Sequence, residues 1–266
     1  MLALYGSALT RLRAAPRLRH SLVLWSAIAL VAGEGFTVGV VVVHSTGAML
    51  AATVSSFVWW VLVLVVVVGG AAWLDTPDGT RLDRYGVPNG LTALRAWACI
   101  PLLFVALLSL PGRLALMLWA GVGGAVGLLD ALDGAIARRY GPISKLGKAI
   151  DPFGDALFFV VGSIGCYLLG IVPLWLAVLV IFRYAAPVVL TPVVFLAHRR
   201  PELVHTVWGR RNTILTGIVF FTLFWVRVAD GPVDVAALFA ALPTLVPTMV
   251  LHFDSLARRT LTAPRV

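Results

Sequence analysis

Four aspartates near the middle of the chain have the type and spacing needed to hold metal ions. Asp130 and Asp133 are three residues apart, and Asp151 and Asp155 are four residues apart. In a helix, residues at these separations share one face, so each pair would present two carboxylates side by side. All four adjoin apolar stretches, where an unpaired carboxylate is costly and needs a partner.

Gly141-Pro142 lies midway between the two aspartate pairs. Proline disfavours helix in the preceding residue and lacks a backbone donor, so we expect the chain to turn there. An antiparallel hairpin about this turn brings all four carboxylates to a similar depth. Oxygen ligands of high negative charge suit Mg²⁺ or Mn²⁺, whereas zinc favours His or Cys. Two such ions could bind a pyrophosphate and stabilise a leaving phosphate during in-line attack.

Small residues and an arginine follow the first aspartate pair. Gly134 and Ala137 share the face of these aspartates and leave a strip where a nucleotide could approach the helix backbone. Arg138, one turn beyond Gly134, is placed to meet a phosphate. A competing interpretation is that the aspartates are solvated helix ends, or form structural ion pairs with basic side chains nearby. Those side chains are Arg138, Arg139, Lys145 and Lys148.

The whole pattern resembles the signature of the CDP-alcohol phosphotransferase family. It reads Asp130-x2-Asp133-Gly134-x2-Ala137-Arg138-x8-Gly147-x3-Asp151-x3-Asp155. The resemblance implies that the four aspartates hold two divalent cations, Mg²⁺ or Mn²⁺, and that Asp155 is also the general base on the acceptor hydroxyl. It further implies a cytidine diphosphate site formed with Gly134, Ala137, Arg138 and Gly147. Upstream, Pro88-Asn89-x2-Thr92-x2-Arg95 resembles the family's other recurrent segment, which places Asn89 and Thr92 close to the nucleotide.

The expected reaction transfers a phosphatidyl group from a CDP-linked lipid donor, CDP-diacylglycerol, to a small polar acceptor and releases CMP. Trp208-Gly209-Arg210-Arg211-Asn212-Thr213 resembles a segment of phosphatidylglycerophosphate synthases and related cardiolipin synthases, which favours glycerol 3-phosphate as the acceptor. Tyr184 and Ala156 depart from that branch, so inositol phosphate, serine, an amino alcohol with a CDP-choline-type donor, or another polyol stays open. The candidate acceptor-binding residues are Arg183, Arg199, Arg200 and Arg210. Arg183 could instead extend its guanidinium to the membrane interface.

The composition requires that these residues be held in a lipid bilayer. Hydrophobic residues make up 60% of the 266, charged residues 12%, and the mean hydropathy is +0.97, whereas soluble domains carry about 25% charged residues. Continuous apolar runs that do not alternate exclude a barrel and predict an all-α, polytopic transmembrane helix bundle with about eight spans. The predicted spans cover residues 21–43, 49–73, 95–111, 114–132, 152–171, 173–197, 212–230 and 235–252.

The chain divides at a polar stretch that follows the second span. We predict an N-terminal extension with two transmembrane helices over residues 1–75, and a six-helix catalytic module over residues 76–266 whose first span is preceded by a short interfacial helix. The role of the extension, and of Glu34 within it, stays open.

The basic residues orient the chain in the membrane. The net charge is +9, but the basic residues gather between spans on the side of both termini, which indicates that both termini are cytoplasmic and that nucleic acid is not a partner. The site is thus expected on the cytoplasmic side of a membrane that we take to be the bacterial plasma membrane, and the resemblance implies a homodimer. A transporter or a silent scaffold is the alternative, but a transporter would place polar sites near the midplane.

Overall fold

The computed structural model describes residues 2–44, 46–108, 110, 112–140, 144–196 and 206–262, and these residues form helices and loops without a β-strand. The α-helices are α1 (Leu2–Ala14), α2 (Pro16–His44), α3 (Met49–Gly70), α4 (Val87–Leu107), α5 (Leu114–Tyr140), α6 (Lys145–Leu168), α7 (Leu174–Leu196), α8 (Val207–Val228) and α9 (Val233–Thr262). Short 3-10 turns occupy Thr46–Ala48 and Ala71–Trp73.

The predicted all-helical membrane fold is confirmed. Within the described residues, seven helices are long and apolar enough to cross a bilayer, namely α2 to α6, α8 and α9. The predicted span 173–197 corresponds to α7, whose described apolar stretch is shorter, Leu174–Leu190. The chain is therefore a multi-pass membrane protein.

Two features of the N-terminal half differ from the expectation. α1 was not predicted, because its 13 residues are too few to span a bilayer. The interfacial helix expected before Arg95 is instead the first part of α4, which runs without a break from Val87. Gly86 precedes this helix with a φ of 78°, a conformation that glycine adopts without strain, and Pro88 stands in its first turn.

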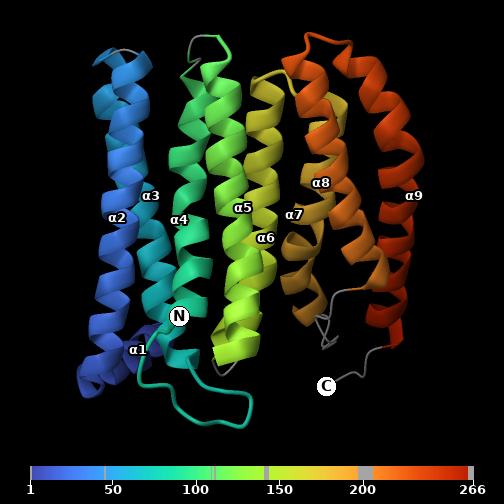
Figure 1. The fold of residues 1–266 in the computed structure, drawn as a ribbon. Coiled ribbons are helices and arrows are strands. Elements are labelled where there is room, and N and C mark those ends of the chain that lie inside the picture. The colour runs from blue at the N-terminus through green and yellow to red at the C-terminus, as the bar shows by residue number, and fades with distance from the viewer. Residues whose placement is uncertain are drawn as a thin grey trace. The chain divides into compact units, whose positions relative to one another are not determined.

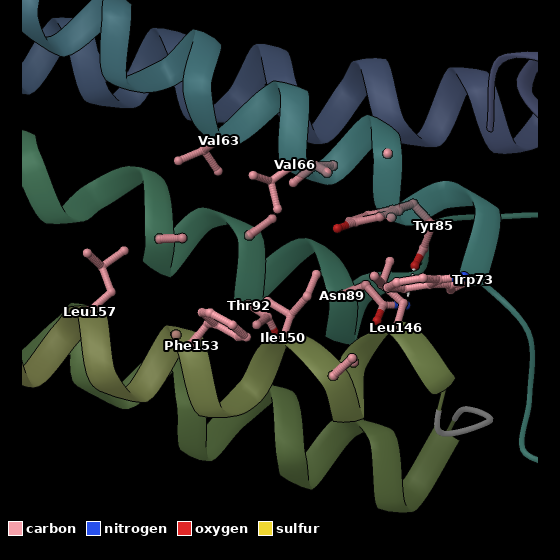
Figure 2. A pocket seen from close by; sticks show the side chains of 18 of the residues that line it. Val63, Val66, Trp73, Tyr85, Asn89, Thr92, Leu146, Ile150, Phe153 and Leu157 are labelled. Atoms are coloured by element: carbon pink, nitrogen blue, oxygen red, sulfur yellow. Dashed lines mark hydrogen bonds between the residues drawn. The ribbon is translucent and has the colours of Figure 1, made fainter. Parts of the chain in front are cut away.

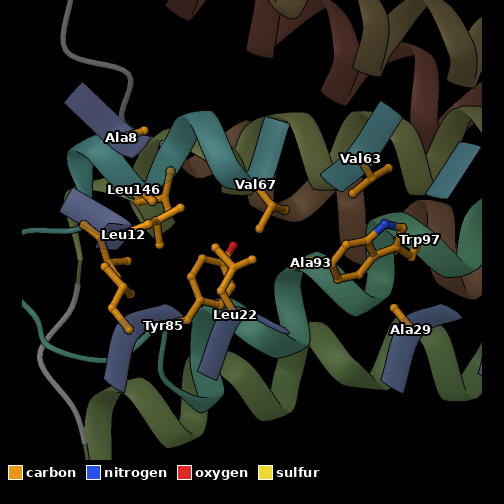
Figure 3. Packing of buried hydrophobic residues seen from close by; sticks show 13 residues of the cluster. Ala8, Leu12, Leu22, Ala29, Val63, Val67, Tyr85, Ala93, Trp97 and Leu146 are labelled. Atoms are coloured by element: carbon orange, nitrogen blue, oxygen red, sulfur yellow. The ribbon is translucent and has the colours of Figure 1, made fainter. Parts of the chain in front are cut away.

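The chain forms two compact units, residues 1–161 and 162–266. In the first unit, α2, α3 and α4 lie side by side and α4 packs on α5 (Figure 1). Figure 3 shows one buried cluster in which Leu22 of α2 and Val67 of α3 meet Tyr85, Trp97 and Leu146. The extension therefore packs directly on residues of the expected catalytic module, and the division near residue 76 stays a prediction.

Arg11 of α1 fixes the linker that joins α3 to α4. Its guanidinium forms an ion pair with Asp75 at 2.9 Å and donates to the carbonyl oxygens of Leu74 at 2.7 Å and Leu82 at 3.3 Å. The carbonyl of Asp75 in turn accepts from the backbone N–H of Lys145, the first residue of α6, at 2.7 Å. α1 and the linker thereby hold the start of the helix that carries Asp151 and Asp155.

The second unit is organised around the hairpin of α8 and α9, which lie side by side (Figure 1). Asn212 of α8 is buried and donates to the carbonyl of Leu245 at 3.0 Å and to the hydroxyl of Thr248 at 2.8 Å. Thr206 caps α8, since its hydroxyl accepts from the backbone N–H of Gly209 at 2.8 Å.

Candidate active site

Arg95 of α4 joins two of the predicted aspartates. Its side chain is 2% exposed, and its guanidinium forms ion pairs with Asp130 of α5 and with Asp155 of α6, the latter at 3.1 Å between Nη2 and Oδ1. The Asp130 side chain is 51% exposed and that of Asp155 is 29% exposed, so both carboxylates are more accessible than the arginine that joins them. Two aspartates that are 25 positions apart in sequence thus converge on one cation.

Gly154 creates the space that Arg95 needs. A Cβ atom at this position would lie 2.7 Å from Nη2 of Arg95 and 3.5 Å from its Cζ. The first distance is shorter than real Cβ contacts, so the guanidinium crosses α6 where α6 has no side chain. A glycine inside a helix costs about 1 kcal/mol relative to alanine, and here it lets the arginine reach Asp155.

A second polar cluster contains two of the predicted nucleotide-binding residues. The Nδ2 of Asn89 donates to the carbonyl of Tyr85 at 2.7 Å, and its Oδ1 accepts from the hydroxyl of Ser144 at 2.7 Å. The Ser144 hydroxyl accepts from the backbone N–H of Gly147 at 2.9 Å, which caps the start of α6. Asn89 and Gly147, 58 positions apart, are therefore neighbours.

Gly147 and Thr92 also fit closely into this part of the first unit. A Cβ atom at 147 would lie 3.2 Å from both Asn89 Oδ1 and Ser144 Oγ, so a larger residue would disturb the cluster. Thr92 lies one turn after Asn89, is 6% exposed, and donates to the carbonyl of Pro88 at 3.1 Å. Burial raises the pKa of the adjacent Tyr85 hydroxyl, so this side chain stays neutral and contributes no charge.

The remaining predicted metal and nucleotide residues lie on α5 and α6. Asp151 is exposed on α6, and Gly134 is half-buried on α5. Asp133, Ala137 and Arg138 belong to α5, but their side chains lie outside the described residues, as do Arg199 and Arg200 entirely.

Two predicted acceptor-binding residues lie in the second unit. Arg183 is 8% exposed, donates to the carbonyl of Gly209 at 3.3 Å and stacks over the ring of Tyr184 at 4.7 Å. Its guanidinium is thus held inside the unit rather than extended to an interface. Arg210 is exposed near the start of α8.

The donor chemistry of the site fits a divalent cation. In the structure the carboxylates of Asp130 and Asp155 both pair with Arg95, and hard oxygen donors of this kind match Mg²⁺ or Mn²⁺. Among the described side chains, no group of three or more His, Cys, Asp or Glu residues is close enough to hold a metal ion. Since the side chain of Asp133 lies outside that set, the four-aspartate site stays a prediction.

Sequence reasoning missed the roles of Gly154, Ser144 and Arg95. Arg95 was noticed only as part of a recurrent segment, although its i+3 spacing from Thr92 places it on the face of α4 that carries Thr92. Gly154 also carried a signal, because a glycine beside Asp155 inside an apolar helix suggests that another group approaches closely.

Comparison with known proteins identifies relatives of this chain. The family model described as CDP-alcohol phosphatidyltransferase matches residues 85–247, which is more than half of the chain. The chain is 30% identical over 131 residues, 49% of its length and 60% of the relative's, to the Mycobacterium tuberculosis (strain H37Rv) protein named "Probable phosphatidylglycerophosphate synthase". It is 41% identical over 59 residues, 22% of its length and 27% of the relative's, to the Streptomyces coelicolor protein named "Cardiolipin synthase (CMP-forming)".

The chain thus aligns with less than two thirds of the length of these curated relatives. No solved structure shows a significant match to it. The family match begins at Tyr85 and includes Asn89, Arg95 and all four aspartates, the residues of the site described above. On the strength of that match, this chain belongs to the CDP-alcohol phosphatidyltransferase family.

Proposed function

We propose that the protein transfers the phosphatidyl group of CDP-diacylglycerol to the hydroxyl of glycerol 3-phosphate and releases CMP, as a step of phospholipid biosynthesis. The observation that carries this proposal is the convergence of Asp130 and Asp155 on Arg95 within the segment that the family model matches. The name of the mycobacterial relative and the Trp208–Thr213 segment support glycerol 3-phosphate as the acceptor.

In the proposed mechanism, Asp155 accepts the proton of the acceptor hydroxyl. The hydroxyl oxygen then forms a bond to the phosphorus that bears diacylglycerol, and the bond from that phosphorus to the bridging oxygen breaks, so the electron pair leaves with CMP. The ion pair with Arg95, 3.1 Å between Nη2 and Oδ1, holds the Asp155 carboxylate in place.

Asp130, Asp133, Asp151 and Asp155 would hold the two divalent cations. When bound, Mg²⁺ or Mn²⁺ would neutralise the pyrophosphate charge and stabilise the departing phosphate. Asn89, Thr92, Gly134, Ala137, Arg138 and Gly147 would bind the cytidine diphosphate. Of these, Asn89 and Gly147 are already oriented by the shared Ser144 hydroxyl.

Arg183, Arg199, Arg200 and Arg210 are the proposed acceptor-binding residues, and their positive charge suits a phosphorylated acceptor. We further propose that both termini and the active site face the cytoplasm, that the membrane is a bacterial plasma membrane, and that the protein is a homodimer. The positive-inside distribution of basic residues supports the orientation.

The acceptor is tested by measuring CMP release from CDP-diacylglycerol in detergent with Mg²⁺ or Mn²⁺. Glycerol 3-phosphate, inositol phosphate, serine, inositol and phosphatidylglycerol are supplied one at a time, and the lipid product is identified by mass spectrometry. We expect release with glycerol 3-phosphate. If CMP is released only with another acceptor, that compound is the substrate instead of glycerol 3-phosphate. If no acceptor gives release, a CDP-choline-type donor or a catalytically silent protein is favoured.

A further inference from the structure

The first unit contains a groove of about 560 Å³ that extends well beyond the expected nucleotide residues. It runs between α3, α4 and α6, and most of its lining is apolar (Figure 2). α3 lies outside the region that the family model matches, so one wall of the groove comes from the N-terminal extension of this chain.

The few polar side chains of the groove lie toward one end, which we call the polar end. Figure 2 shows Tyr85 and Asn89 near one end, whereas Val63 and Leu157 lie toward the other. Thr92, Gly147 and Gly154 also line it, which makes it continuous with the nucleotide cluster and with the Arg95 contact of Gly154. An occupant would therefore need a polar head at the expected nucleotide site and an apolar tail along α3.

The lining includes side chains that are also reachable from the outside of the unit. Leu62 and Val66 of α3 and Phe153 of α6 are each more than half exposed, although they border the groove. Such apolar side chains face lipid in a membrane, so an acyl chain could enter sideways from the bilayer. Along α3, Trp59 to Gly70 extends about 16 Å, enough for a large part of one acyl chain.

The extension also determines how the polar end is closed. Gly70 of α3 lies so near the start of α6 that a Cβ atom there would be 2.6 Å from Leu146, and Tyr5 and Trp73 border the same end. The hydroxyl of Tyr5 donates to the carbonyl of Val65 at 3.2 Å, which ties α1 to α3. Because the groove is closed at this end, the apolar tail of an occupant would extend along α3 toward Leu62.

We infer that α3 of the N-terminal extension completes a binding groove for one acyl chain of the CDP-linked lipid donor, and so contributes to the choice of donor by chain length. This inference rests on the proposed function for the identity of the headgroup. The extension of residues 1–75 thereby acquires a role in substrate binding through α3.

A matched pair of variants tests the groove. Val66 lines it and Val65 does not, yet both are partly exposed valines on adjacent positions of α3. Val66→Trp should lower kcat/KM for a dioleoyl CDP-diacylglycerol by about tenfold, the effect of displacing roughly two methylene groups from an apolar site. Its effect on kcat/KM for a dihexanoyl donor should be smaller, because a shorter chain contacts less of the groove, and Val65→Trp should change kcat/KM for neither donor.

Photo-crosslinking tests the same inference without turnover. CDP-diacylglycerol with a diazirine in one acyl chain should label peptides of α3 and α6, with competition by unlabelled CDP-diacylglycerol and reduced labelling in Val66→Trp. A phosphatidic acid with the same diazirine chain controls for bulk lipid. Equal labelling by both probes, or no label on α3, would overturn the inference, as would equal kinetic effects in the two variants. A wild-type protein that is labelled on α3 but releases no CMP would refute only the proposed reaction.

Discussion

Gly154→Ala tests whether the contact between Arg95 and Asp155 supports catalysis. The new Cβ atom would lie 2.7 Å from Nη2, and ordinary van der Waals contact begins at 3.4 Å, so the guanidinium must move by about 0.7 Å. Because Asp155 is on the same helix as Gly154, this movement lengthens the 3.1 Å contact by as much as about 0.7 Å, which would take it beyond hydrogen-bonding distance.

The size of the effect follows from the kind of contact that is lost. A hydrogen bond to a charged group contributes about 1.5–3 kcal/mol, so kcat should fall about ten- to a hundredfold if that energy holds Asp155 in its reactive position. KM for the acceptor should change little, because the altered residue acts through the base. The assay is CMP release at saturating CDP-diacylglycerol with the acceptor concentration varied.

Gly162→Ala on the same helix is the matched control. Among the described residues, no atom lies within 4 Å of a Cβ at this position outside its own stretch of helix, and alanine is the better helix former. We expect unchanged kcat and an unchanged or slightly higher melting temperature. Size-exclusion chromatography shows whether the Gly154→Ala protein is folded. If it is folded and its kcat equals that of Gly162→Ala, the role given to Arg95 is refuted.

Three further predictions concern the nucleotide cluster, the packing of the extension and the cations. Asn89→Ala should raise KM for CDP-diacylglycerol by about tenfold, since Ser144 and Gly147 lose the group that orients them, whereas a change in kcat alone would contradict this. Gly90→Ala should lower the free energy of unfolding by about 1–3 kcal/mol, because its Cβ would overlap the ring of Trp25 in α2; urea titration measures the change, and Gly124→Ala should have no such cost. Chelation with EDTA should abolish CMP release, and added Mg²⁺ or Mn²⁺ should restore it; full activity after chelation would exclude the proposed cations.

The sequence could predict the local part of this site but not its long-range contacts. The aspartate spacing within α5 and α6 follows helical periodicity, and the apolar runs indicate the membrane spans. Both features could therefore be predicted from the sequence. The contact of Arg95 with Asp155 joins positions 60 residues apart, and no periodic pattern encodes it. The sequence did not predict α1, because this helix is too short to give a membrane-span signal. It did not predict the groove, because the walls of the groove come from three helices that are separated in sequence.

The central claim is that Asp155 takes the acceptor proton in a CMP-releasing transfer. The most direct test is the rate of CMP release from CDP-diacylglycerol and glycerol 3-phosphate by wild type, Asp155→Asn and Asp83→Asn. Asp83 is the matched control, because it is an exposed aspartate whose pairing with Arg17 at 3.4 Å lies outside the site. We predict release by wild type and by Asp83→Asn, and a loss of at least about a hundredfold in Asp155→Asn. Release by Asp155→Asn at the wild-type rate would contradict the proposed mechanism.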